Sequence, residues 1–419
     1  MIAGLLVLAA LTFAFCMVGR RLSGTMVTAP LVFLGLGWFL SLTGLLPHLA
    51  MEGTLHLVAE VALIVVLFLD AAQIDLRVLR IRHVWPVRML ALGLPLTIAL
   101  GTLAAYPFLP GWPLVAVALV AAILAPTDAA LGQIVVTNPV VPERVRRALT
   151  VESGLNDGLA LPVVLLFASL AAGAMASEET NWLVFGAKQL ILGPVVGIVA
   201  GLVGGRVLLL AKKHNLTSQT FEGIGTLALA VAAYLGATQI GGNGFISAFV
   251  AGLFFGHVVK GQCKFVFDFT ESEGRLLTWG AFLLLGLVLV PGALQHLTLA
   301  NLAIILLSLF VVRPLAIWLS LLGSDASTIT RLFFGWFGPR GLATALFSLL
   351  IVERVAPEIA EPVLALGVNA VWISALLHGL SAAPAARWYG ALIEAMGECP
   401  ETMKIESSAK PLVTHHDQE

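Results

Sequence analysis

Charged residues are scarce in this sequence. Asp, Glu, Lys and Arg make up 11% of the 419 residues, whereas 59% of the residues are hydrophobic. Soluble globular domains carry about 25% charged residues, which form their polar surface. The formal net charge of −1 also provides no strong field that would attract a nucleic acid. The composition therefore excludes a soluble globular domain, argues against a nucleic-acid partner, and predicts a membrane protein.

Cysteine is scarce as well. Cys16, Cys263 and Cys399 are the only three cysteines, and they lie far apart without the spacing of a metal site. They predict neither a disulfide framework nor a site for a soft metal. No cofactor is expected, apart from an ion that the protein would carry as its substrate.

The sequence also lacks a basic segment ahead of its first apolar run. The run from Ile2 to Val18 is followed, not preceded, by Arg20 and Arg21. A secretory signal has the opposite order. We therefore expect the first run to be a retained span with its N-terminus outside.

Long apolar runs dominate the rest of the chain. A run of about 17–25 apolar residues is long enough to cross a bilayer as a helix. On this criterion the sequence predicts an all-α polytopic membrane protein with about 13 transmembrane helices. The expected spans are 2–18, 26–46, 54–73, 86–107, 112–136, 149–176, 182–210, 220–238, 243–259, 275–294, 300–322, 332–353 and 362–386.

Basic residues gather in alternate loops between these spans. Cytoplasmic loops of membrane proteins are enriched in Lys and Arg. An outside N-terminus and a cytoplasmic C-terminus place nearly all of them inside, with Arg354 and Lys188 as the exceptions. The expected inward residues are Arg20, Arg21, Arg77, Arg80, Arg82, Arg88, Arg144, Arg146, Arg147, Arg206, Lys212, Lys213, Lys260, Lys264, Arg275, Arg331, Arg387, Lys404 and Lys410.

An odd number of spans suits two inverted six-helix repeats joined by a linking helix over 182–210. The fifth span, with Pro126 and TDAA at 127–130, then corresponds to the twelfth, with GPRG at 338–341. Proline beside polar residues in mid-membrane predicts a broken helix, whose freed backbone groups can face an ion. We expect residues 391–419 to form a short, disordered cytoplasmic tail.

The sixth span contains the most informative polar residues, in VESGLNDGLALP at 151–162. Helical spacing puts Glu152 and Asn156 on one face, and Ser153 and Asp157 on the neighbouring face. Carboxylate, amide and hydroxyl oxygens are the ligands that a hard cation prefers. Burial favours the protonated form of a carboxylate, so a proton and a cation would compete for Asp157. We expect this competition to drive cation/proton exchange.

Other charged residues within the spans have alternative interpretations. Glu152 and Arg340 could form a structural ion pair, which is the favoured reading. Asp128, next to Thr127, could join the ion site or could neutralise the dipole of a half-helix N-terminus, and both can hold. Asp70 could face the ion path or lie at the membrane interface.

Four segments, in this order, resemble a known family: LFLDAAQIDL, APTDAAL, ESGLNDGLALPVV and GWFGPRGLATAL. Over residues 1–390 the sequence is similar to the cation/proton antiporter superfamily, in its NhaP-like sodium/proton exchanger branch. The resemblance implies a homodimer in an inner membrane of bacterial type. It also implies a dimerisation part (1–80 and 220–295) and a core (86–176 and 300–386) that moves like an elevator.

The resemblance also assigns roles to residues. It makes Asp157 the group that binds cation and proton alternately. Asn156, Ser153, Thr127 and Asp128 would assist, with Na⁺ liganded by Asp157, Ser153 and Thr127. Asp70 stands where relatives often have a longer Glu, and Glu152 and Arg340 match a buried ion pair. A single carboxylate in the Asn-Asp pair implies electroneutral exchange, one cation for one proton.

The favoured function is therefore Na⁺/H⁺ or Li⁺/H⁺ antiport, which contributes to pH homeostasis, and the protein is not expected to be an enzyme. An antiporter of the same mechanism that moves K⁺ is the nearest alternative. A cation channel is less favoured, because no repeated pore loop or charged ring is visible. An intramembrane protease would need a Gly-x-Gly-Asp or Gly-x-Ser-Gly motif, and the chain has neither.

Overall fold

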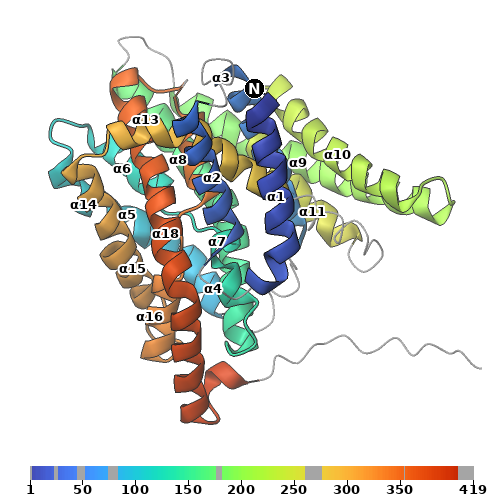
Figure 1. Ribbon diagram of the computed structural model, residues 1–419. Coiled ribbons are helices and arrows are strands. Elements are labelled where there is room, and N and C mark those ends of the chain that lie inside the picture. Colours follow the sequence, from blue (N-terminus) through green and yellow to red (C-terminus); the bar gives the residue numbers. More distant parts are fainter. Residues whose placement is uncertain are drawn as a thin grey trace, which may run out of the picture.

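The computed structural model describes residues 2–22, 27–44, 52–73, 84–175, 182–259, 276–352 and 354–403. Within these ranges the regular structure is entirely helical (Figure 1). Seven of the described helices are long and apolar enough to cross a membrane, and shorter apolar helices accompany them. The prediction of an all-α membrane protein with several spans is confirmed, whereas the count of 13 and the inverted repeat stay predictions.

The yellow-green helix at the right of Figure 1, α10 (Gln219–Gln239), packs with α3 (Glu52–Gln73), α9 (Trp182–Lys213) and α11 (Gly244–Val259). Near the N-terminus, α1 (Ile2–Leu22) and α2 (Ala29–Thr43) are in contact through Phe15 and Phe33. Gly193, Gly197 and Gly201 recur at every fourth position of α9. A Cβ at Gly197 or Gly201 would meet backbone atoms of α11, and one at Gly193 would meet the carbonyl oxygen of Asn243, just before α11. Small residues at this spacing let two helices approach closely in a membrane.

Three of the expected spans contain a π-helical turn, which the sequence analysis did not anticipate. These turns are Met89–Gly93 between α4 (Val84–Arg88) and α5 (Leu94–Ala105), Leu285–Leu289 before α13 (Val290–Gln295), and Ser308–Val312 between α14 (Leu299–Leu307) and α15 (Arg313–Ser320). Each turn ends two residues before a proline, namely Pro95, Pro291 and Pro314. Proline lacks an N–H and clashes with the carbonyl four residues earlier, and the wider turn relieves that clash.

The two expected helix breaks are present. In the fifth span, α6 (Leu114–Ile123) stops and α7 (Ala129–Val136) follows after residues 124–128. In the twelfth span, α16 (Thr328–Trp336) stops and α17 (Leu342–Leu350) follows after residues 337–341. The proline and polar residues of each segment therefore end a helix at the expected place.

Two long helices extend beyond the expected spans. Helix α8 (Glu143–Met175) begins before the expected sixth span, and α18 (Pro357–Met396) runs along much of the molecule in Figure 1. The boundary of the tail at residue 391 is wrong, because α18 continues to Met396 and a short 3₁₀ helix, Pro400–Thr402, follows. The side chain of Glu401 is buried, with 1% of its surface exposed, so this segment is docked on the protein.

Several expectations fall outside the described residues. These are the placements of Arg77, Arg80, Arg82, Lys260, Lys264, Arg275, Lys404 and Lys410, of Cys263, and of the tail beyond residue 403. The predicted orientation in the membrane rests partly on them.

Candidate functional site

The two helix breaks lie against each other. The backbone N–H of Asp128, in the first break, donates to the carbonyl oxygen of Pro339 in the second at 2.9 Å. The carboxylate of Asp128 accepts a hydrogen bond from the N–H of Leu342, the first residue of α17, at 2.9 Å. Asp128 therefore caps the positive end of the half-helix across the break, which supports the helix-dipole interpretation of this residue.

Arg340, in the second break, contacts the C-terminal end of α6 at the first break. Its guanidinium donates to the carbonyl oxygens of Ala125 and Pro126, at 3.1 and 3.3 Å, just after α6 ends. It also donates to the hydroxyl of Ser308 at 3.1 Å. The last carbonyls of a helix lack partners within it and carry partial negative charge. Each break thus supplies the charge that stabilises a helix end of the other break.

The structural ion pair of Glu152 has a different partner from the expected one. Glu152 is paired with Arg313, whose terminal nitrogens lie 3.2 Å from Oε1 and 3.3 Å from Oε2. Both side chains are 3% exposed. The expected pair of Glu152 with Arg340 is therefore wrong, because Arg340 is held by backbone carbonyls. The structural role proposed for Glu152 is retained.

The π-helical turn explains how Arg313 reaches this acid. The N–H of Arg313 bonds to the carbonyl of Ser308, five residues earlier, so these two residues lie above one another. Ser308 contacts Arg340 while Arg313 contacts Glu152. Pro314, the residue after Arg313, was the feature of the sequence that could have indicated this turn.

The polar residues predicted around the ion site form one network. The Thr127 hydroxyl lies 3.2 Å from that of Ser153 and 3.3 Å from Oε2 of Glu152. The amide of Asn156 donates to Thr127 and, at 3.4 Å, to Oε1 of Glu152. All four side chains are buried. Glu152 and Asn156 thus lie on the same face of α8, as predicted. Their hydrogen bonds with Thr127 connect α8 to the first helix break.

Asp157 stands apart from this network. Its side chain is half-buried, and among the described residues its Oδ1 atom is buried without a hydrogen-bond partner. Three other carboxylates, those of Asp128, Asp70 and Glu152, lie near enough for their negative charges to act on it. An oxygen in this position can accept a proton or a cation.

Asp70, near the C-terminal end of α3, is exposed, although Leu69 and Ala71 beside it are buried. It lies near enough to Asp128 and Asp157 for the charges of these acids to act on one another. Both sequence-based interpretations of Asp70 stay predictions.

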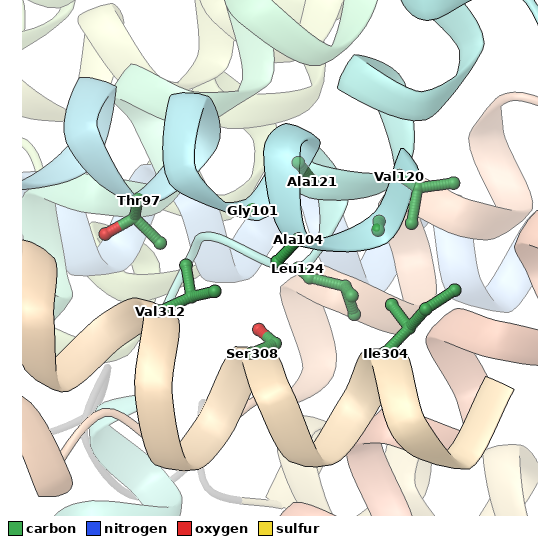
Figure 2. A pocket seen from close by; sticks show the side chains of 10 residues that line it. Thr97, Gly101, Ala104, Val120, Ala121, Leu124, Ile304, Ser308 and Val312 are labelled. Carbon is green, nitrogen blue, oxygen red and sulfur yellow. The ribbon is translucent and has the colours of Figure 1, made fainter. Parts of the chain in front are cut away.

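No group of three or more His, Cys, Asp or Glu side chains has the geometry of a metal site within the described ranges. A small cavity of about 10 Å³, room for one water molecule, lies between α5, α6 and the helix from α14 to the π-helical turn (Figure 2). Thr97 and Ser308 are its polar lining residues. The predicted ion-site residues do not line it.

Two acids within helices were missed by the sequence analysis. Glu60 on α3 accepts a hydrogen bond from the phenol of Tyr234 on α10. Glu222, near the start of α10, is 3% exposed and lies 3.6 Å from Lys212. Glu222 lies in the first turn of α10, where sequence position alone does not distinguish an interfacial residue from a buried one.

Comparison with known proteins gives a family match along most of the chain. Residues 6–388 match the family model described as "Sodium/hydrogen exchanger, transmembrane". A K(+)/H(+) antiporter NhaP from Alkalimonas amylolytica is 29% identical over 356 residues, 84% of this chain and 61% of the relative. A K(+)/H(+) antiporter NhaP2 from Shewanella sp. (strain ANA-3) is 29% identical over 338 residues, 80% of this chain and 58% of the relative.

A solved structure has a similar fold. The sodium proton antiporter MjNhaP1 from Methanocaldococcus jannaschii superposes with a TM-score of 0.74 at 21% identity, covering 95% of this chain and 99% of that one. At this identity the likeness concerns the fold. The aligned part of the chain spans about three fifths of the length of the two curated relatives, 61% and 58%.

Proposed function

The chain belongs to the sodium/hydrogen exchanger family, a family of transporters rather than enzymes, and from that premise we propose that it exchanges a monovalent cation for a proton. The reaction is secondary active antiport in a multi-pass membrane protein. Asp157 binds the cation or the proton, but not both at once.

The observation that carries this proposal is the environment of Asp157. Its Oδ1 atom is buried and has no hydrogen-bond partner among the described residues, and the negative charges of Asp128, Asp70 and Glu152 act on this carboxyl group. Like charges nearby and loss of water disfavour an empty, ionised carboxylate. A proton bound to the carboxylate removes that penalty, and so does a bound cation. Because both bind to the same carboxylate of Asp157, binding of one excludes binding of the other.

K⁺ is the favoured cation, ahead of Na⁺ and Li⁺, which the sequence analysis preferred. The two curated relatives at 29% identity are named K(+)/H(+) antiporters, whereas the protein named as a sodium proton antiporter is 21% identical. The oxygen ligands at the site are compatible with any of these ions. Na⁺/H⁺ exchange by the same mechanism is the second candidate.

The remaining features of the proposal come from the family resemblance. They are a homodimer, a core that moves like an elevator, an inner membrane with the C-terminus in the cytoplasm, and electroneutral exchange. The neutral Asn156 beside Asp157 supports the exchange of one cation for one proton. A flux that changes with an imposed membrane potential would contradict that stoichiometry.

The test is cation-driven collapse of a pH gradient in proteoliposomes, with K⁺, Na⁺ and Li⁺ added in turn. We expect K⁺ to collapse the gradient, and Asp157→Asn to abolish the response. Glu361→Gln is the matched control, because Glu361 is an exposed acid on α18 that takes no part in the site.

Two results would overturn the proposal. Failure of every monovalent cation in well-reconstituted protein would remove cation exchange. Full activity of Asp157→Asn would leave exchange intact and move its site elsewhere.

A further inference from the structure

Buried oxygen atoms without partners are rare, and they point to the groups that a ligand can satisfy. Among the described side chains, five such oxygens occur. Two belong to Glu222 and Glu401, whose carboxylates are otherwise engaged by Lys212 and by Ser327 with Thr330. The other three are Oδ1 of Asn156, Oδ1 of Asp157 and Oγ1 of Thr344.

Thr344 is the one member of this set that neither the sequence nor the family resemblance had indicated. It is fully buried, with 0% of its surface exposed, and it is the third residue of α17. Hydroxyls within helices commonly bond to the carbonyl four residues earlier. Those of Thr97, Thr226 and Ser348 do so here, at 2.8 Å each.

Thr344 cannot follow this pattern. The residue four positions earlier is Arg340, which lies in the helix break, and the cap residue Gly341 has an extended backbone with φ −127° and ψ −146°. The hydroxyl of Thr344 is left without a partner in the described part of the chain.

The position of Thr344 directs it toward the helix breaks. Side chains in a helix lean toward its N-terminus, and residues three apart share a face. Gly341, three residues before Thr344, packs so closely on Asp128 that a Cβ there would overlap its carboxylate. The N–H of Leu342 donates to that same carboxylate. Thr344 thus lies about one turn further along the face that contacts Asp128.

We propose that the hydroxyl of Thr344 is part of the cation-binding site and helps determine which monovalent cation the protein selects. This inference rests on the proposed function and deepens it. Thr127 and Ser153 already bond to each other and to Glu152 and Asn156. Thr344 adds an oxygen from the first turn of α17, which follows the second helix break, so the site draws ligands from the segments around both breaks. The number of coordinating oxygens is one determinant of selectivity between cations of different size.

The test compares Thr344→Val, which keeps the shape and removes the hydroxyl, with Thr344→Ser, which keeps the hydroxyl. Thr226→Val is the matched control, because Thr226 is a buried threonine whose hydroxyl bonds within its own helix. Two measurements are made on each protein. One is the cation concentration for half-maximal exchange with K⁺ and Na⁺, and the other is the rise in unfolding temperature that each cation causes in detergent.

We expect Thr344→Val to weaken cation binding about 3- to 10-fold in both measurements, the effect of one lost oxygen contact. The ratio of K⁺ to Na⁺ affinity should change, and Thr344→Ser should restore both values. Unchanged affinities and an unchanged ratio in Thr344→Val would overturn the inference, as would an equal effect of Thr226→Val. Because stabilisation by cations reports binding without exchange, failure of the antiport proposal would be recognised separately.

Discussion

Glu152 and Asp157 lie five residues apart on α8, yet their surroundings differ in almost every respect. Glu152 is 3% exposed, is paired with Arg313 and accepts hydrogen bonds from Thr127 and Asn156. Asp157 is half-buried, keeps an unbonded oxygen among the described residues and has carboxylates as its charged neighbours. A paired acid holds helices together, whereas an unpaired acid is available to an exchangeable ion. The comparison therefore separates the structural charge from the candidate transport charge.

The largest effect on stability is expected from Glu152→Ala. This change leaves Arg313 buried without its counter-charge, and breaking a buried pair costs about 3–5 kcal/mol. Chemical or thermal unfolding of the purified protein in detergent measures the loss. The double variant Glu152→Ala with Arg313→Met should recover much of it, since both charges are then absent. A double variant no more stable than the single one would show that the pair has another role.

Asp157→Asn should have the opposite effect on stability. It removes a carboxylate on which the negative charges of Asp128, Asp70 and Glu152 act, so we expect the free energy of unfolding to rise by about 1–3 kcal/mol while exchange is lost. The same unfolding measurement, combined with the transport assay, checks both. If Asp157→Asn is instead less stable than the wild type, the carboxylate of Asp157 has a stabilising partner in the membrane. Asp157 and Glu152 would then both be paired acids.

Asp128→Asn should have a smaller effect. An asparagine side chain can still accept the hydrogen bond from the N–H of Leu342, but it no longer brings a negative charge to the start of α17. We expect a loss of about 0.5–1 kcal/mol. If the unfolding free energy instead changes as little as it does for the exposed acid Glu361→Gln, Asp128 acts on the ion alone.

The smallest effect is expected near the C-terminus, where Glu401 accepts hydrogen bonds from the N–H of Ser327 at 2.9 Å and the hydroxyl of Thr330 at 2.7 Å. Partial burial raises the pKa of Glu401, but these hydrogen bonds outweigh burial and lower the pKa below its ordinary value. The contact is therefore fully present above the unfolded-state pKa of about 4.3. It is lost as the pH falls through the lower folded-state pKa.

Glu401→Ala should cost about 1 kcal/mol at neutral pH, because Glu401 caps the N-terminus of α16. Hydrogen exchange of the backbone amides of residues 327–330, measured at pH 7 and below pH 4, reports the loss of the contact with Glu401. In the Glu401→Ala variant these amides should exchange rapidly at both pH values. Slow exchange in the variant at pH 7 would show that the cap does not depend on this carboxylate. Asp325 is the internal control for acid titration. It is paired with Arg144 and accepts a hydrogen bond from Trp85, and the Glu401→Ala variant leaves these contacts in place.

Composition and hydropathy alone predicted much of the fold. Inside a membrane, only helices and closed β-barrels satisfy their own backbone hydrogen bonds. Long uninterrupted apolar runs are typical of helices, so the all-α class followed from the sequence. Proline beside Thr127 and beside Arg340 predicted both helix breaks. Helical spacing placed Glu152 and Asn156 on one face of α8. These features depend on local backbone chemistry, which short segments of sequence contain.

The tertiary structure decided which charges meet. Glu152 pairs with Arg313, 161 residues away, and not with Arg340, because the carbonyls freed at the end of α6 already occupy Arg340. The π-helical turn that directs Arg313 inward, the docking of Glu401 and the unpartnered hydroxyl of Thr344 were likewise not predicted. Each of these features depends on contacts between segments that are far apart in the chain. A buried polar or charged group needs a partner, but the sequence offers several candidates, and the packing of the helices determines which one is within reach.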